Sequence, residues 1–352
     1  MKNKLTKIGV SALCGSLATI SAAQAGEITV KGSAQTTYTK ASTGTVGNPL
    51  GMNTGLTFVG SGELDGGTTV SYTLTHADKA AYSAGSLAIG TPSFGTFTIS
   101  HASGGGGLGA YDDKMPTAWE ETWGTGLTTG IKLVSGIGTS MNLQYTTPKV
   151  LGTTIAVAYA PAVGVADTAD KASGVSENEK GKGYDATVNI NPTLGTEILS
   201  GLNLFVGGHY VEHTTGSSTI QENLYEGTAG ITYDLGPVSI GWQQSGHITG
   251  LEKSTTAVSH YRGHMYGISF NINDDLSVSY GHAESRKAGF VNMDSNSAAG
   301  DENARRVEAS SVQLAYTMGG ASIRVAETSA KNVGFSSGTD RDATVVSVSL
   351  AF

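Results

Sequence analysis

The chain has almost no cysteine and few charges, and these shortages exclude several kinds of protein. Its one cysteine, Cys14, lies within the first 25 residues, so the rest of the chain has neither disulfides nor thiol chemistry. Charged residues make up 14% of the chain, against about 25% in an ordinary soluble domain. No apolar run of about 18 residues follows residue 25, which excludes a helical membrane protein. The formal net charge of −8 argues against a nucleic acid partner.

The first 25 residues have the order of a secretory signal peptide. Three lysines precede a mostly apolar stretch from Ile8 to Ile20, and Ala23-Gln24-Ala25 offers small residues for cleavage before Gly26. Leu13 stands where a lipoprotein needs a small residue, which excludes Cys14 as a lipid-bearing cysteine. We therefore expect residues 1–25 to be removed and residues 26–352 to form one domain. Losing three lysines and no acidic residue takes the formal net charge from −8 to −11.

What the chain does have is alternation of apolar and polar residues over its whole remaining length. In "EITVKGSAQ", Ile28 and Val30 point one way while Thr29 and Lys31 point the other. The same period of two recurs in "TSMNLQYTT", "LYEGTAGITYDL", "PVSIGWQQ", "DLSVSYGH" and "ATVVSVSLAF". Gly is abundant, at 50 residues, but follows no collagen period. The pattern predicts many β-strands, each with one apolar and one polar face.

Tight turns such as "LDGGT", "DLGPV" and "TMGGA" alternate with long polar loops between these strands. This order is typical of an antiparallel meander with two unlike ends. No helical segment is available to cover the apolar faces, so we expect a closed transmembrane β-barrel, apolar outside and polar inside. We count about sixteen strands, and a barrel of that size leaves a water-filled channel instead of a packed core.

Several segments resemble the general porins of Gram-negative bacteria, and together they cover nearly all of residues 26–352. "TGLTFVGSGELDGGTTVSYTLT" resembles the second strand, turn and third strand of that family, and "FGTFTISHAS" resembles the strand leading into its constriction loop. "MNLQYTTPKVLGTTIAVAYAP" resembles the strand pair that follows, and the terminal Phe352 resembles the family's assembly signal. The resemblance implies a sixteen-stranded, trimeric barrel in the outer membrane, through which small hydrophilic solutes and ions diffuse passively.

The resemblance also implies what surrounds and narrows the barrel. Outer-membrane lipid and lipopolysaccharide would contact the wall, and the barrel-assembly machinery would act on Phe352. The third external loop would fold inward and narrow the pore. "KMPTAWEETW", residues 114–123, occupies the position of that loop. The alternative is an external loop whose acidic residues are incidental.

We expect the loop to be anchored by Trp119 and Trp123 and to present acidic side chains to the pore, namely Asp112, Asp113, Glu120 and Glu121. In the family these acids face arginines on the opposite wall, but Gly55 and Val59 occupy positions where basic residues are common. His101 stands where Arg usually ends the strand before the loop, and Ser140 falls near another expected Arg. On the wall we expect Lys31, His101 and Arg324 at the constriction, with Lys132 and Arg306 as weaker basic candidates.

A nearly unopposed acidic constriction favours cations, because the charge that lines a pore sets its selectivity. The alternative is that loop lysines fill the gap and leave little preference. Both interpretations are open from the sequence.

Other chemistry has little support in the sequence, and we expect no metal, no cofactor and no catalytic site. His209 and His213 share a strand face, but strand residues four apart are separated by about 13 Å, too far for one ion. The same holds for His260 and His264, so we interpret all four as solvated lumen histidines. "GGGGLG" lacks the strand–helix context of a phosphate-binding loop. Acidic loop residues lack the calcium-loop pattern, namely Asp167, Asp170, Glu177, Glu179, Asp294, Asp301 and Glu302.

Two functions besides a passive channel stay open. An outer-membrane barrel enzyme would need Ser or Asp paired with His near the barrel end, and the sequence shows no nucleophile elbow. An adhesin or structural anchor would use the long external loops to bind a partner.

Overall fold

The computed structural model describes residues 26–41, 48–78, 80–101, 106–122, 127–163, 180–192, 197–213, 222–252, 257–289 and 306–352. The fold of these residues is almost entirely β-sheet. The strands are β1 (Glu27–Ala41), β2 (Leu50–Leu64), β3 (Thr68–Ala77), β4 (Ala80–Thr91), β5 (Gly95–His101), β6 (Asn142–Thr146), β7 (Thr153–Ala160), β8 (Lys180–Ile190), β9 (Leu202–His213), β10 (Leu224–Leu235), β11 (Val238–Ile248), β12 (Val258–Asn271), β13 (Leu276–Gly289), β14 (Arg306–Met318), β15 (Ala321–Lys331) and β16 (Arg341–Ala351).

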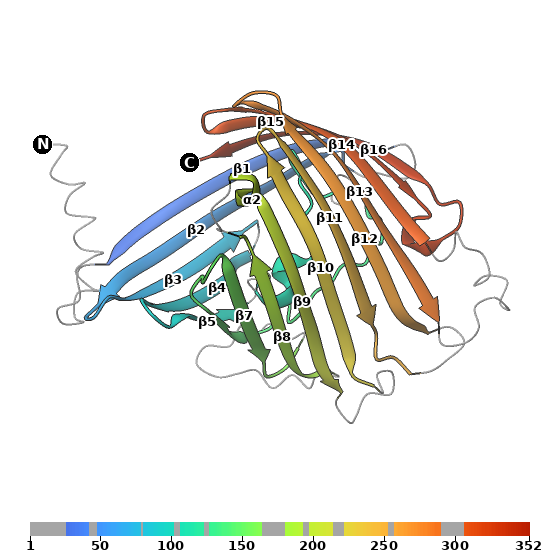
Figure 1. The fold of residues 1–352 in the computed structure, drawn as a ribbon. Coiled ribbons are helices and arrows are strands. Elements are labelled where there is room, and N and C mark those ends of the chain that lie inside the picture. Colours follow the sequence, from blue (N-terminus) through green and yellow to red (C-terminus); the bar gives the residue numbers. More distant parts are fainter. Residues whose placement is uncertain are drawn as a thin grey trace, which may run out of the picture.

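The strands form one closed antiparallel barrel, in which each strand pairs with its neighbours along the chain (Figure 1). The ring closes where β1 pairs with both β2 and β16, with Ser33 opposite Ala351 and Ala41 opposite Ala343. Closure removes both sheet edges, so every strand finds hydrogen-bond partners without water. The sixteen strands within the described ranges confirm the fold predicted from the alternating pattern.

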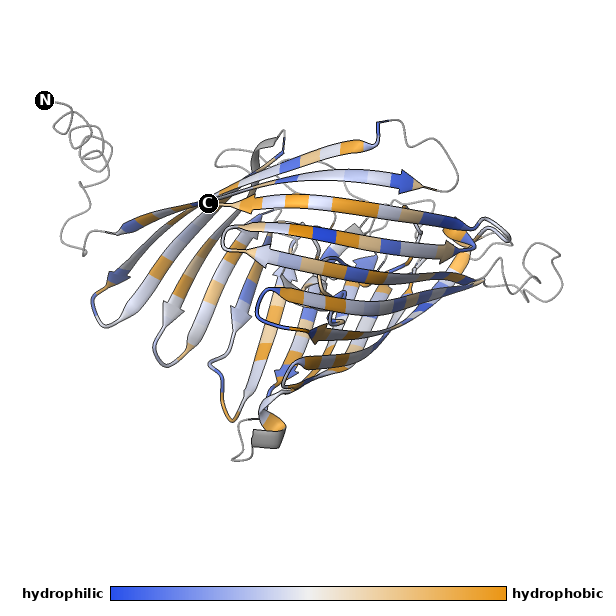
Figure 2. Cartoon of the chain, turned by 90° about the horizontal axis from the view of Figure 1, so that it is seen from above, coloured by the Kyte–Doolittle hydropathy of each residue, from blue (hydrophilic) through white to orange (hydrophobic). Residues whose placement is uncertain are grey.

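The two faces of the wall differ in chemistry. Large apolar side chains face outward and stay exposed, as Ile240, Trp242 and Ile268 do at 41%, 46% and 45%. Buried polar residues alternate with them, and Gln243, beside Trp242, has no exposed surface. Figure 2 shows orange and pale or blue residues taking turns along the strands. The exterior is therefore suited to hydrocarbon and the interior to polar contacts.

Tyrosine side chains form a row across the exterior of four neighbouring strands. Tyr159, Tyr184, Tyr210 and Tyr225 lie opposite one another in register from β7 to β10. Their successive ring centroids are 5.2, 6.2 and 5.3 Å apart. Amphipathic rings in a band are typical of the boundary between hydrocarbon and headgroups.

Most connections at one end of the barrel are short turns. Each of β2–β3, β10–β11, β12–β13 and β14–β15 is joined by four residues or fewer, whereas 40 residues separate β5 from β6. Three short helical turns, η1 (Gly107–Tyr111), α2 (Glu197–Ser200) and η3 (Val333–Phe335), lie in connections. None of the helices in the described ranges has the length and apolar character to cross a membrane.

Some predicted features fall outside the described residues. These are the signal peptide at residues 1–25, Trp123, and the acidic loop residues considered for calcium.

Candidate functional site

Segment 106–140 makes up most of the connection between β5 and β6. Its described residues, 106–122 and 127–140, are hydrogen-bonded to the interior side of the barrel wall. In Figure 1 it is drawn in teal behind β8 and β9. Two buried carboxylates hold its ends. The Oδ2 atom of Asp185 accepts the N–H groups of Leu108 at 2.6 Å and Ile137 at 3.1 Å. Glu226 Oε2 accepts the N–H groups of Ser135 and Gly136, both at 2.7 Å.

Each of these carboxylates also contacts a histidine on the next strand. Asp185 on β8 is bonded to His209 Nδ1 on β9, and Glu226 on β10 lies 2.7 Å from His247 Nδ1 on β11. His209 is 4% exposed, which corrects our interpretation of it as a solvated lumen histidine. A buried carboxylate needs such partners, because an unpaired buried charge costs several kcal/mol. The sequence could not show the pairing, since it arises from strand register.

Glutamine side chains hold the middle of segment 106–140. Gln243 accepts the N–H of Lys114 at 3.0 Å and donates to the carbonyl groups of Tyr111 and Asp112 at 2.8 and 3.0 Å. Gln313 accepts the N–H of Glu120 at 2.9 Å and donates to its carbonyl at 2.6 Å. An amide can both donate and accept, so one side chain satisfies several backbone groups.

Glycines in the wall let the segment approach closely. A Cβ atom added to Gly241 would lie 2.7 Å from Pro116 Cδ, and one added to Gly281 would lie 2.1 Å from Thr122 Oγ1. Neither position tolerates a side chain without displacing the segment. Part of the high glycine content therefore serves this contact.

Aliphatic side chains complete the attachment. Ile137 packs with Ala158, Ala160, Val163 and Val211. Met115 packs with Met265 and Ala283, joined by the partly buried Ile131 and Leu133. Leu108 has no exposed surface. Trp119 is half-buried, and its backbone N–H donates to Gln313 Oε1 at 3.1 Å. The anchoring contacts that the structure records are thus mainly hydrogen bonds and aliphatic packing.

The four predicted acidic residues of the segment lie close enough to affect one another. Burial raises the pKa of Asp113 to about 7, with further repulsion from Glu121 and Asp112. Burial, together with a hydrogen bond to Glu121 and repulsion from it, raises the pKa of Glu120 to about 7, although the nearby Arg324 lowers it. The pKa of Asp112 is also raised by burial. A group of carboxylates this close resists full ionisation at neutral pH.

The basic residues considered for the constriction lie on different sides of the barrel wall. Arg324 lies on the interior side of β15, near Glu120. Lys31 is exposed on the interior side of β1. His101 is 6% exposed, and the alternation of β5 places it with Phe97 and Ile99 on the exterior side, which corrects its expected place at the constriction. Arg306 shares the exterior side of β14 with Val312 and Leu314 instead of facing inward.

Gly55 and Val59 lie on the interior side of β2, so neither places a charge there. Lys132 is half-buried, and its backbone N–H donates to Ser285 Oγ at 2.9 Å. Among the described residues of the barrel wall, Arg324 is the positively charged residue that lowers the pKa of one of these acidic residues, Glu120.

Comparison with known proteins identifies the family. The family model described as Gram-negative porin matches residues 9–352, almost the whole chain. This chain belongs to the Gram-negative porins. The protein is therefore a β-barrel of the outer membrane and a channel for small solutes. A search of curated proteins found no match.

Solved structures share the fold at low sequence identity. A Salmonella typhi OmpF complex with daunomycin is 13% identical, with a TM-score of 0.65 over 93% of this porin and 98% of that chain. A porin refined at 1.8 Å is 14% identical, with a TM-score of 0.62 over 93% and 100%. The trimer form of OmpT, an outer membrane protein of Vibrio cholerae, is 11% identical, with a TM-score of 0.60 over 94% and 100%.

The C-terminal Phe352 lies at the seam of the porin barrel. Its backbone exchanges two hydrogen bonds with Gly32, at 2.6 and 2.9 Å. A Cβ atom on Gly32 would lie 2.3 Å from Phe352 Cε2, so the absent side chain makes room for the ring. Phe352 nevertheless remains 75% exposed. The pairing of β16 with β1 thus continues through the last residue, Phe352.

Proposed function

We propose that segment 106–140 is the constriction of a passive diffusion channel and that its acidic residues make the channel prefer cations. The observation that carries the proposal is the grouping of Asp112, Asp113, Glu120 and Glu121 on a segment bonded to the interior wall. Solutes cross down their gradient, and no bond is made or broken. Only weak contacts suit this role, because a tight site would stop conduction.

The balance of charge supports cation preference. Near the four carboxylates, the electrostatic partners are one arginine of the wall, Arg324, and one of the segment's two lysines, Lys114. A permeating cation is therefore attracted more strongly than an anion of the same size. Lys31 would add a positive charge nearer the short-turn end of the wall.

We also propose that the porin is a trimer in a layer of lipid and lipopolysaccharide. The trimer form of the Vibrio cholerae protein supports the first part, because it shares this fold. The apolar exterior and the tyrosine row support a lipid environment. Phe352 would be the residue that the barrel-assembly machinery recognises, and residues 1–25 would direct export.

Planar bilayer recordings test the channel proposal. Purified porin should give large ohmic conductance steps, and a salt gradient should give a reversal potential of the sign expected for a cation-preferring pore. Glu120→Gln combined with Glu121→Gln should move that potential toward zero. Glu212→Gln is the matched control, because Glu212 is an exposed acid on the exterior side of β9.

An unchanged reversal potential in the double variant would contradict the assigned constriction. Absence of conductance steps would contradict the channel itself and favour an anchor or an enzyme.

A further inference from the structure

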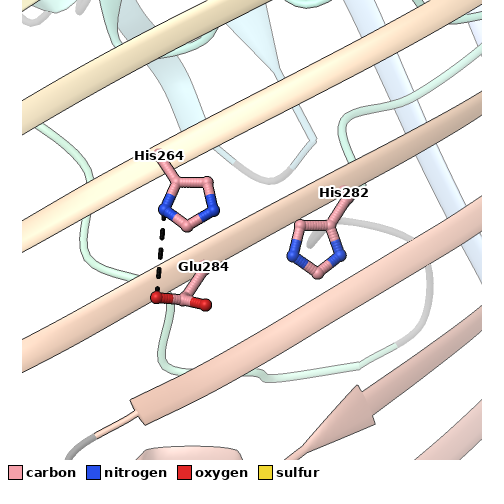
Figure 3. Close-up of side chains that lie close together, drawn as sticks. All are labelled: His264, His282 and Glu284. Atoms are coloured by element: carbon pink, nitrogen blue, oxygen red, sulfur yellow. Dashed lines mark ion pairs between the residues drawn. The ribbon is translucent and has the colours of Figure 1, made fainter.

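Two histidines and a glutamate form a compact group on β12 and β13. One potential ligand atom from each of His264, His282 and Glu284 lies within 4.8 Å of the others. Figure 3 shows the two imidazole rings and the carboxylate side by side on the neighbouring strands. The ring centroids of His264 and His282 are 6.2 Å apart. These three residue types are the nitrogen and oxygen ligands that zinc prefers.

The group lies on the exterior side of the wall, away from segment 106–140. His264 shares its side of β12 with Tyr266 and Ile268, which are 42% and 45% exposed. On β13, the opposite side carries Ser279 and Ser285, which bond to segment 106–140. This placement corrects our interpretation of His264 as a lumen histidine. A ligand bound here would be separate from the pore.

Strand register explains why the three side chains meet. His264 lies directly opposite Glu284, and His282 precedes Glu284 by two residues on the same face of β13. Directly opposed side chains have Cβ atoms about 4.5–5.5 Å apart, and diagonal neighbours are about 7–8 Å apart. Long side chains therefore converge across two strands, whereas histidines four apart on one strand cannot.

The distance between two of the three ligand atoms is close to that around a tetrahedral ion. His264 Nδ1 lies 3.8 Å from Glu284 Oε1, too far for a hydrogen bond. Ligands bound at about 2.0–2.1 Å around a tetrahedral zinc ion lie about 3.3 Å from each other. Closing the pair by about half an ångström, within the freedom of χ rotations, would bring both atoms to the ion.

Ser310 orients one of the three potential ligands, His282. His282 Nδ1 lies 2.9 Å from Ser310 Oγ on β14, which leaves Nε2 of the same ring available. Metal-binding histidines usually engage their other ring nitrogen in this way, because the contact sets the tautomer and the ring orientation. Ser310 would act as a positioning residue.

Charged side chains surround the group. Glu284 is bonded to Arg286 Nε at 2.7 Å and lies 3.8 Å from Arg306 Nη1. Glu308, directly opposite Glu284, takes Arg306 Nε at 3.0 Å. Arg262, opposite Arg286, and Lys331, opposite Glu308, add two more cations on this side of the wall, so the three ligands must hold a dication against this positive charge.

We propose that His264, His282 and Glu284 bind one divalent late transition-metal ion, zinc above all, on the exterior of the barrel. Three protein ligands leave one tetrahedral position for water or another oxygen ligand from outside. Mg²⁺ would bind poorly, because it prefers oxygen ligands in octahedral geometry.

Zinc titration of the folded barrel in detergent, followed by isothermal calorimetry, tests this proposal. We expect one ion per chain, a zinc affinity far above that for Mg²⁺, and an X-ray absorption spectrum with two imidazole nitrogens. His264→Asn or His282→Asn should weaken zinc binding by at least about tenfold, and Glu284→Gln should weaken it similarly. His76→Asn, a histidine on β3 outside the group, should leave the affinity unchanged.

Mobility on unheated gels establishes that each variant is folded; where one histidine variant does not fold, the other gives the same comparison. Zinc binding of equal strength in the folded His264 and His282 variants would overturn the proposal. Absence of a stoichiometric zinc site in the unaltered barrel would also overturn it.

Discussion

The cation preference of this porin should rise with pH through the neutral range. Asp113 and Glu120 have pKa values of about 7, raised chiefly by burial. A carboxyl group with a raised pKa is neutral below that value and charged above it. At about pH 5 roughly one in a hundred of each is ionised, and at about pH 8.5 nearly all are. The segment therefore gains close to two negative charges across this interval.

The size of the effect follows from Coulomb's law. A unit charge about 6 Å from a permeating ion in water contributes about 0.7 kcal/mol. Screening with a Debye length of about 10 Å at 0.1 M salt reduces this to about 0.4 kcal/mol. Two charges act on cation and anion with opposite sign, which separates them by about 1.5 kcal/mol, or about tenfold in permeability ratio.

Reversal potentials under a salt gradient, recorded at several pH values, give this ratio. The combined variant Asp113→Asn and Glu120→Gln should lose most of the pH dependence. Histidines also gain positive charge as the pH falls, so the difference between the variant and the original barrel isolates the two carboxyls. Equal pH profiles for the two barrels would refute the reasoning.

Two further predictions concern the attachment of segment 106–140. Gln243→Leu should lower the free energy of unfolding by about 3 kcal/mol, because it removes three hydrogen bonds to backbone groups of the segment, each contributing about 1 kcal/mol. Gln244→Leu, on the exterior side of the same strand, should change it little in a urea titration. Gly281→Val should push Thr122 off the wall and reduce single-channel conductance. Gly246→Val, where nothing lies within 4 Å of the added Cβ, should conduct normally; equal conductance in both variants would contradict the close contact.

The sequence predicted the barrel because period-two alternation is local. Ile28 against Thr29, or Trp242 against Gln243, shows which side of the wall each residue occupies. The strand number and the long connection between β5 and β6 follow from the same pattern and the turn residues. The family model then identified the chain as a porin.

The wall contacts of segment 106–140 could not be predicted, because they join residues far apart in the chain. Gln243 bonds to backbone groups about 130 residues away, and Gln313 to groups about 190 residues away. In the sequence Gln243 looks no different from Gln244, which faces outward. The pairing of His264 with Glu284, in contrast, could have been predicted from the sequence. The short turn after Asn271 sets the register of β12 and β13, and the sequence argument considered only pairs along one strand.

The most direct test of the constriction uses a single introduced thiol. The barrel after residue 25 has no cysteine, so Glu121→Cys gives one labelling site on an exposed residue of segment 106–140. A water-soluble methanethiosulfonate reagent should react with it and lower the current through an open channel, whereas the same treatment of Gln244→Cys, on the exterior side of the wall, should leave the conductance unchanged. Complete labelling of Glu121→Cys, established by mass spectrometry, with unchanged conductance and selectivity would contradict the account.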